Sequence, residues 1–287
     1  MTFGHTRFIW NQMLGMLNER YQNNPNLKML SYSKLSSLIP QLKREYPWLK
    51  DVDSIAIQCS VKTLSDTFDR FFKEVCRYPK FKSRKQTVQS YLSTIRGESI
   101  RFNDNQRYVK LPKLGWVKCR MSVPHIENER IKSVTIKQKP SGKYTISVLV
   151  TSENQTLPKT HQTVGIDLGV SDFVITSDGH KYRSQRLHLK YQKQLHVWEK
   201  RMARRRLRAK AEYKSLSESK NYQKARQQVA RIHEKIAHTR KDYIHKITTD
   251  LVKNYDVIVI EDLKTSNLLK NHHLARSIAS QSWHQFK

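Results

Sequence analysis

Two short apolar runs, nearly a hundred residues apart, each carry one carboxylate. Val164–Val170 contains Asp167, and Val257–Leu263 contains Glu261. Each run has the length and composition of a buried β-strand. A carboxylate there is costly to bury unless it is paired or binds a metal ion. If the strands are neighbours, the two acids meet at one edge of a sheet, where they could hold divalent cations for phosphodiester hydrolysis by two metals ~3.5–4 Å apart.

The elements around these acids occur in an order that would bring them together. The first run is followed by two further short strands around a turn at Ser177–Gly179, then by two long helical stretches, and then by the second run. This is the order of an RNase H-like fold, in which a right-handed crossover places the last strand parallel to the first and beside it. Strand alternation points Asp262 to the opposite face, so Glu261 is the favoured metal ligand.

The overall charge indicates a polyanionic partner. The 287 residues carry 54 Lys and Arg against 24 Asp and Glu, a formal charge of +30. Nucleic acid is the commonest such partner. A membrane is not expected, because we find no signal peptide and no apolar run of about 18 residues. Cys59, Cys76 and Cys119 are widely spaced, which predicts neither disulfides nor a zinc site and fits a reducing cytoplasm.

Two segments concentrate this charge. In Tyr78–Lys85 aromatic and basic residues interleave, as in segments that contact phosphates and stack on bases. The alternative is a basic loop with Phe81 packed into a core. Residues 181–246 hold 21 Lys and Arg against 5 Asp and Glu, which favours nucleic-acid contact by a helical hairpin over a merely solvated face. The candidate contacts are Lys80, Phe81, Lys82, Arg84, Lys85, Arg201, Arg204, Arg205, Arg206 and Arg208.

The pattern as a whole predicts a multidomain α+β protein. Residues 1–85 read as a helical bundle, with a helix bent or split at Pro40 and a longer one capped by Asp53 or Ser54. Residues 86–160 contain short antiparallel strands, including a hairpin turning at Pro140–Gly142, and predict a small β-barrel or sandwich. Residues 151–163 predict a linker, and residues 161–287 the domain with the two acids.

Five separated motifs together resemble the TnpB (OrfB) family of transposon-encoded proteins, historically called transposases. They are Gly165–Gly169, Ile258–Leu263, the Asn267…Lys270-Asn271…Leu274-Ala275 segment, Ser282-Trp283…Phe286 and Pro79–Lys85.

The resemblance implies an RNA-guided DNA endonuclease in which the protein reads a short flanking DNA motif and guide pairing reads the rest. It implies a helical recognition lobe at 1–85, a wedge-like β-barrel at 86–160 and a RuvC-like nuclease domain at 161–287. Asp167 would be the first catalytic acid and Glu261 the second, both binding Mg²⁺. The partners would be a guide RNA and a double-stranded DNA target, in the cytoplasm of a prokaryote at the nucleoid.

Two departures from the family pattern carry further expectations. Relatives open with an additional β-strand, so the barrel is expected to lack one. Relatives also continue beyond Lys287 with a four-cysteine zinc knuckle and a third catalytic Asp, so the RuvC-like domain is expected to be incomplete and cleavage impaired. The alternative function is a nuclease-inactive RNA-guided DNA-binding protein or transcriptional repressor; an unguided basic DNA-binding protein is a third possibility.

Overall fold

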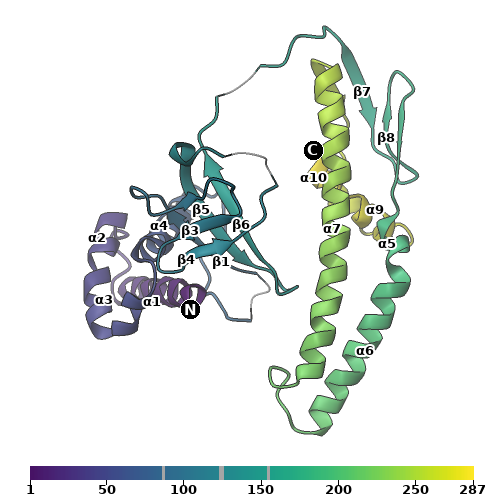
Figure 1. Cartoon of the computed structure of the whole chain (residues 1–287). Coiled ribbons are helices and arrows are strands. Elements are labelled where there is room, and N and C mark those ends of the chain that lie inside the picture. Colours follow the sequence, from purple (N-terminus) through teal and green to yellow (C-terminus); the bar gives the residue numbers. More distant parts are fainter. Residues whose placement is uncertain (86–87, 123–125, 154–155) are drawn as a thin grey trace. The chain divides into compact units, whose positions relative to one another are not determined.

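The structure is a computed structural model that describes residues 1–85, 88–122, 126–153 and 156–287. The chain separates into two compact units, Met1–Glu153 and Asn154–Lys287 (Figure 1). The boundary falls within the expected linker at 151–163, of which Asn154 and Gln155 lie outside the described residues. The expected division between helical and β-rich domains begins at Gln86, also outside the described residues, and stays a prediction.

The first part of unit 1 is helical, as predicted. Asp53 caps helix α4 (Ser54–Phe72) by accepting a hydrogen bond from the Ile55 amide at 2.9 Å. Pro40 lies in the first turn of a new helix, where its missing N–H costs nothing, so the predicted split is confirmed. The elements are α1 (Thr2–Asn23), α2 (Tyr32–Ser37), α3 (Ile39–Glu45), the 3₁₀ helix η1 (Pro47–Asp51) and α4 (Ser54–Phe72). Apolar side chains of α1 and α4, spaced three and four residues apart, form the core of this part.

The rest of unit 1 consists of two three-stranded antiparallel sheets, β1-β5-β6 and β2-β3-β4. The predicted hairpin is confirmed: Ile136 pairs with Ile146 and Val134 with Val148 across a turn in which Gly142 has a φ of 83°. The strands are β1 (Gln89–Thr94), β2 (Arg101–Phe102), β3 (Tyr108–Leu111), β4 (Gly115–Lys118), β5 (Ile131–Gln138) and β6 (Tyr144–Val150), with the 3₁₀ helix η2 (Asn128–Arg130) before β5.

The predicted β-barrel is wrong for the residues described. A barrel needs one continuous ring of paired strands, but no pairing joins the two sheets in the described part of the chain. The physical reason is that the sheets already share a core. Phe102, Val109 and Val134 pack in one cluster with Ala56 of α4, so their apolar faces are covered without closure.

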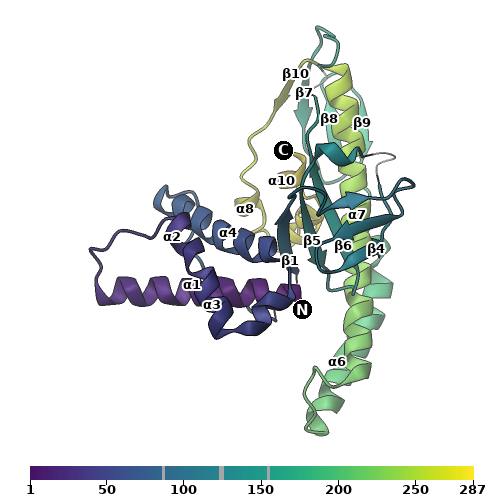
Figure 2. The same ribbon diagram turned by 60° about the vertical axis from the view of Figure 1, so that its left-hand side comes forward.

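Unit 2 contains a four-stranded sheet of order β10-β7-β8-β9 (Figure 2). β7 (Thr163–Asp167), β8 (Asp172–Thr176) and β9 (Lys181–Arg183) are antiparallel neighbours, whereas β10 (Val257–Ile260) pairs with β7 in parallel. This is the predicted strand order. The helices are α5 (Leu187–Lys190), α6 (Gln192–Ala211), α7 (Lys220–Asn254), α8 (Thr265–Leu268), α9 (Ala275–Gln281) and α10 (Trp283–Phe286).

The core of unit 2 forms between the sheet and the helices that follow it. Val164, Ile166 and Phe173 pack with Ile247 of α7 and Trp283 of α10. β10 departs from the expectation of a buried strand: Val257, Ile258 and Val259 are exposed. The reason is that β10 is the edge of the sheet, with a neighbour on one side. None of the helices in the described ranges is both long and apolar enough to cross a membrane.

Candidate functional site

The two predicted acids lie at the same end of neighbouring parallel strands. Ile260 of β10 is paired with Ile166 of β7, so the residues that follow, Glu261 and Asp167, come at the same level. Residues opposed on adjacent strands share a face of the sheet. Asp167 ends β7 and Glu261 follows β10 directly, and both side chains are exposed. A long crossover, including α6 and α7, has therefore brought two distant carboxylates to one edge.

This pair of carboxylates suits a hard cation. Mg²⁺ takes oxygen ligands, keeps several of its waters, and is commonly held by one or two carboxylates. Asp167 and Glu261 are ligands of the type that Mg²⁺ takes, and their exposure leaves room for those waters; Mg²⁺ binding by the pair stays a prediction. Within the described ranges no group of three or more His, Cys, Asp and Glu is arranged to hold a metal ion. Asp262 is separate from the pair: its side chain is 97% exposed and lies 3.4 Å from the Lys287 Nζ.

The loop after Asp167 is tightly held. A Cβ added to Gly169 would lie 2.6 Å from the Asp172 carbonyl oxygen, so glycine is required for this close approach. The Gln281 Nε2 donates to the Val170 carbonyl at 3.2 Å, and the Ser184 amide donates to the Ser171 carbonyl at 3.2 Å. The backbone beside the first acid is thereby fixed by contacts from α9 and the chain after β9.

In unit 1 the predicted basic segment is bound along α1. The Trp10 Nε1 donates to the Lys80 carbonyl at 3.0 Å. Asn11 and Lys82 exchange two hydrogen bonds: the Lys82 amide donates to Asn11 Oδ1 at 2.8 Å and the Asn11 amide donates to the Lys82 carbonyl at 2.9 Å. Phe81 is 55% exposed, so it is not packed into a core. Its exposed ring, with exposed Arg84 and Lys85, leaves the segment free to meet a ligand.

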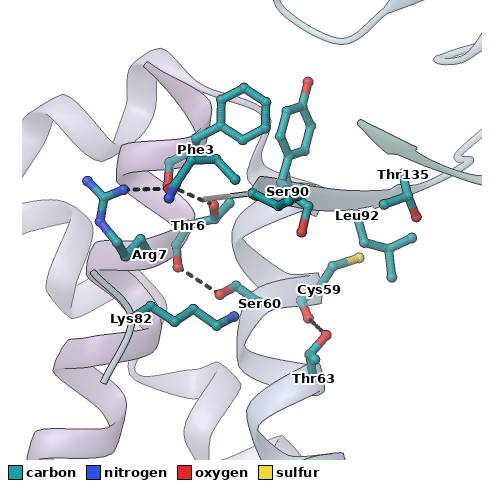
Figure 3. Close-up of a pocket in the computed structure, with 14 residues that line it drawn as sticks. Phe3, Thr6, Arg7, Cys59, Ser60, Thr63, Lys82, Ser90, Leu92 and Thr135 are labelled. Atoms are coloured by element: carbon teal, nitrogen blue, oxygen red, sulfur yellow. Dashed lines mark hydrogen bonds between the residues drawn. The ribbon is translucent and has the colours of Figure 1, made fainter. Parts of the chain in front are cut away.

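Lys82 points from this segment into a pocket of about 300 Å³ between α1, α4 and β1 (Figure 3). Its ammonium lies 3.5 Å from the centre of the Trp10 ring, and burial lowers the pKa of Lys82 to about 8. The Arg7 guanidinium lines the same pocket and donates to Gln89 Oε1 at 2.7 Å. The sequence did not single out Arg7, because it lies on a helix distant in sequence from the basic segment.

In unit 2 the predicted basic hairpin is formed by α6 and α7, which run side by side (Figures 1 and 2). Leu187, Tyr191 and Ile232 form a small core, extended by Trp198. The predicted arginines differ in their surroundings. Arg201 stacks on Trp198 at 4.7 Å, and Arg208 forms an exposed ion pair with Glu212 at 2.8 Å.

The remaining three arginines separate into two kinds. Arg204 and Arg206 are exposed. Arg205 is half-buried, and its Nη1 donates to the Asn221 carbonyl at 2.8 Å. Arg205 therefore joins the two helices, whereas Arg204 and Arg206 face water and stay candidate phosphate contacts.

Comparison with known proteins identifies the family. A family described as "Probable transposase" (OrfB of IS605) matches residues 145–272, and a helix-turn-helix domain of the same proteins matches residues 1–25. "Putative RNA-guided DNA endonuclease InsQ" of Escherichia coli (strain K12) is 31% identical over 99% of this chain and 70% of its own length. The chain belongs to the TnpB (OrfB) family.

A second relative agrees with this membership. A "Putative RNA-guided DNA endonuclease" of Streptomyces pristinaespiralis is 30% identical to this TnpB-family chain, over all of it and 68% of the relative. Among solved structures, a chain from the cryo-EM structure of a CRISPR-Cas12f ternary complex aligns with 99% of this chain and 68% of its own, at 13% identity and a TM-score of 0.33.

Proposed function

We propose that this TnpB-family chain is an RNA-guided DNA endonuclease whose second unit is an RNase H-like (RuvC) nuclease domain. The observation that supports it most is the parallel pairing of β10 with β7, in a register that brings Glu261 level with Asp167. The names of the two relatives indicate that a guide RNA is the partner and DNA the substrate. The charge of +30 suits both polyanions.

In this proposal Asp167 and Glu261 act as metal ligands rather than as bases. Mg²⁺, when bound, would supply an activated water and stabilise the leaving oxygen. The held loop at Gly169 keeps Asp167 in place while the substrate binds. Phosphates of the guide and the target would contact Lys80, Lys82, Arg84 and Lys85 in unit 1, and the exposed arginines of the hairpin in unit 2.

A cleavage assay tests the proposal. The full chain, purified with its co-expressed RNA, is incubated with a matched double-stranded DNA and Mg²⁺. Each acid holds the metal through an interaction worth several kcal/mol in the transition state, so Asp167→Ala and Glu261→Ala should each lower the rate at least about a hundredfold. Asp262→Ala is the matched control, because that exposed carboxylate is predicted to point away, and it should cut like the wild type.

The second candidate is an RNA-guided DNA-binding protein that does not cut. The two metal ligands, Asp167 and Glu261, favour this candidate. Two carboxylates suffice to hold one Mg²⁺, whereas hydrolysis by two metals needs two metal ions ~3.5–4 Å apart. The same assay separates the candidates. RNA-dependent binding of matched DNA without product would support the second, and binding that requires no RNA would contradict both.

A further inference from the structure

Unit 2 contains a cluster of positive side chains that the metal site does not use. We name Arg186, His188, Arg240 and Arg276 the arginine–histidine cluster. They come from the residue before α5, from α5, from α7 and from α9. Arg186 lines one pocket together with His188 and a second, smaller pocket together with Arg240. Arg276 is on α9, one residue before Ser277, which lines the first pocket. In keeping with this arrangement, the pKa of His188 is lowered by burial and then by the positive charges of Arg276, Arg186 and Arg240.

Two nitrogen atoms of this cluster are buried without a hydrogen-bond partner in the described part of the chain. They are His188 Nδ1 and Arg240 Nε. The other end of the Arg240 guanidinium is satisfied, since Nη1 donates to Ser282 Oγ at 2.8 Å. A buried polar nitrogen left unpaired destabilises the folded state. A ligand bearing acceptor oxygens would remove that destabilisation.

In the described part of the chain no carboxylate is paired with the arginines of the cluster, Arg186, Arg240 and Arg276. Tyr243 lines the smaller pocket beside Arg240, and its pKa is raised by burial and then by the charge of Asp172. Three guanidinium groups and an imidazole around unpaired nitrogens are suited to an anion with several oxygens, and guanidinium groups match phosphate in particular.

Two members of the cluster line a pocket beside the first metal ligand. Arg186 and His188 line a space of about 300 Å³ together with Val170, Ser171, Ser277 and Gln281. Val170 and Ser171 belong to the short loop that begins directly after Asp167 and is held by Gln281. An anion in this pocket would therefore lie beside the backbone that carries the first metal ligand.

We propose that the arginine–histidine cluster binds one backbone phosphate of the DNA strand that is cut at Asp167 and Glu261. The proposal rests on the proposed function for the identity of the strand. It assigns the cluster a positioning role: it holds a phosphate near the scissile one, so that the strand passes the two carboxylates in a fixed register.

The binding of phosphate itself is tested without RNA, metal or cleavage. Inorganic phosphate is titrated into the wild-type chain while the ¹⁵N signals of the His188 ring are followed by NMR, with sodium chloride of matched ionic strength as the control. Phosphate should shift the Nδ1 signal and raise the pKa of His188 well beyond the rise that chloride causes by screening the arginine charges. The double variant Arg186→Gln/Arg276→Gln should weaken the phosphate response about tenfold, since it removes two charged donors.

The source of the phosphate is tested by DNA affinity against salt concentration. A single-stranded DNA is bound by the wild type, by Arg186→Gln/Arg276→Gln, and by Lys34→Gln/Lys253→Gln, which removes the same charge at two exposed sites elsewhere on the chain. If the cluster no longer binds its phosphate, the slope of log K against log salt should fall by about 0.7. The lysine control should retain the wild-type slope. Arg186 and Arg276 are exposed, so the variant keeps its core, and its unfolding temperature should match the wild type.

The outcomes distinguish this inference from the proposed function. An unchanged His188 signal in phosphate, or an unchanged DNA slope, would overturn the inference even if the wild type cuts DNA. A slope that falls for guide RNA but not for DNA would also overturn it. A phosphate-dependent shift together with a lower DNA slope would support DNA phosphate binding by the cluster even if Asp167→Ala showed that no cleavage depends on the carboxylates; in that case the proposed function, and with it the identity of the bound strand, would fail.

Discussion

The pKa of the half-buried Lys82 ammonium depends on its surroundings. Its pKa is lowered to about 8 by burial, and its ammonium lies 3.5 Å from the centre of the Trp10 ring. The unfolded chain binds this proton up to about pH 10.4, so the folded state is penalised below pH 8 and gains stability as pH rises from 8 to 10.4. A bound phosphate would reverse this penalty by favouring the charged form.

The first prediction follows from this increase of stability with pH. Lys82→Met should stabilise unit 1 by about 1–2 kcal/mol at pH 7, because it removes a buried charge and keeps the apolar stem. The gain should shrink as the pH rises from 8 to 10.4, where the wild-type lysine becomes neutral. Urea unfolding of both proteins at several pH values measures the difference. Lys80→Met, at an exposed lysine of the same segment, is the control and should show no such trend.

Asp178 provides a second prediction at this scale. Hydrogen bonds from the Thr176 hydroxyl, the Tyr255 hydroxyl and the His180 amide hold the pKa of Asp178 at about 2. The stabilisation is therefore present above pH 3.8 and is lost as the pH falls towards 2. Tyr255→Phe should raise the pKa of Asp178 towards its ordinary value in a ¹³C NMR titration. Tyr243→Phe removes a hydroxyl that bonds to the Arg183 carbonyl instead, and a shift of Asp178 in that variant would contradict the assignment.

At the scale of elements, the loop between β7 and β8 shows how close packing can position a metal ligand. Gly169→Ala would put a methyl group 2.6 Å from the Asp172 carbonyl oxygen, so the backbone must move. We expect a loss of about 1–3 kcal/mol in the free energy of unfolding and, because Asp167 is two residues away, a fall in cleavage. Thermal unfolding and the cleavage assay measure the two effects.

Gly165, in β7 itself, gives the matched control. Its added Cβ would meet Ser177 Cβ at 3.6 Å, an ordinary van der Waals distance. Gly165→Ala should therefore keep the wild-type unfolding temperature within a few degrees. If both alanine variants were equally stable, the close approach at Gly169 would not be what fixes the loop.

The hairpin of α6 and α7 allows a prediction that separates binding from folding. Arg204→Gln/Arg206→Gln changes two exposed side chains and should reduce the slope of log K against log salt by about 0.7–0.9 for each phosphate that the variant no longer binds. Arg205→Gln instead removes the bond to the Asn221 carbonyl, so it should lower the unfolding temperature more than it changes the slope. Nucleic-acid titrations and thermal unfolding on both variants decide this, and an unchanged slope would make Arg204 and Arg206 part of a solvated face.

At the scale of the whole molecule, two compact units joined by an irregular segment predict where the chain is cut first. Residues 156–162 have no regular secondary structure and contain one site for trypsin, the exposed Lys159. Exposed irregular segments are the preferred sites of proteolysis. Brief trypsin treatment of the full chain should therefore produce fragments 1–159 and 160–287 before the helices are cut. Lys159→Gln should remove this first cleavage, which mass spectrometry would detect.

Features that depend on local periodicity and residue type could be predicted from the chain alone. Apolar spacing predicted α1 and α4, alternation predicted the β5–β6 pairing, and a carboxylate at each of two strand ends indicated the site of Asp167 and Glu261. These follow from the chain because helices and strands repeat over a few residues. The order of elements even predicted the parallel partner of β7, since crossovers between parallel strands have one hand.

Features that depend on which surfaces meet emerged with the packed fold. Two sheets share a core with α4, so the strands do not close into a barrel, and β10 is exposed because it is the edge of its sheet. Arg186 and Arg240 line one pocket although they lie tens of residues apart in the chain, and Arg186 lines a second pocket with His188. Local sequence patterns carry no information on these tertiary contacts. The free energy of such contacts comes from burial and charge contributed by segments that are distant in sequence, and it is gained once those segments have packed.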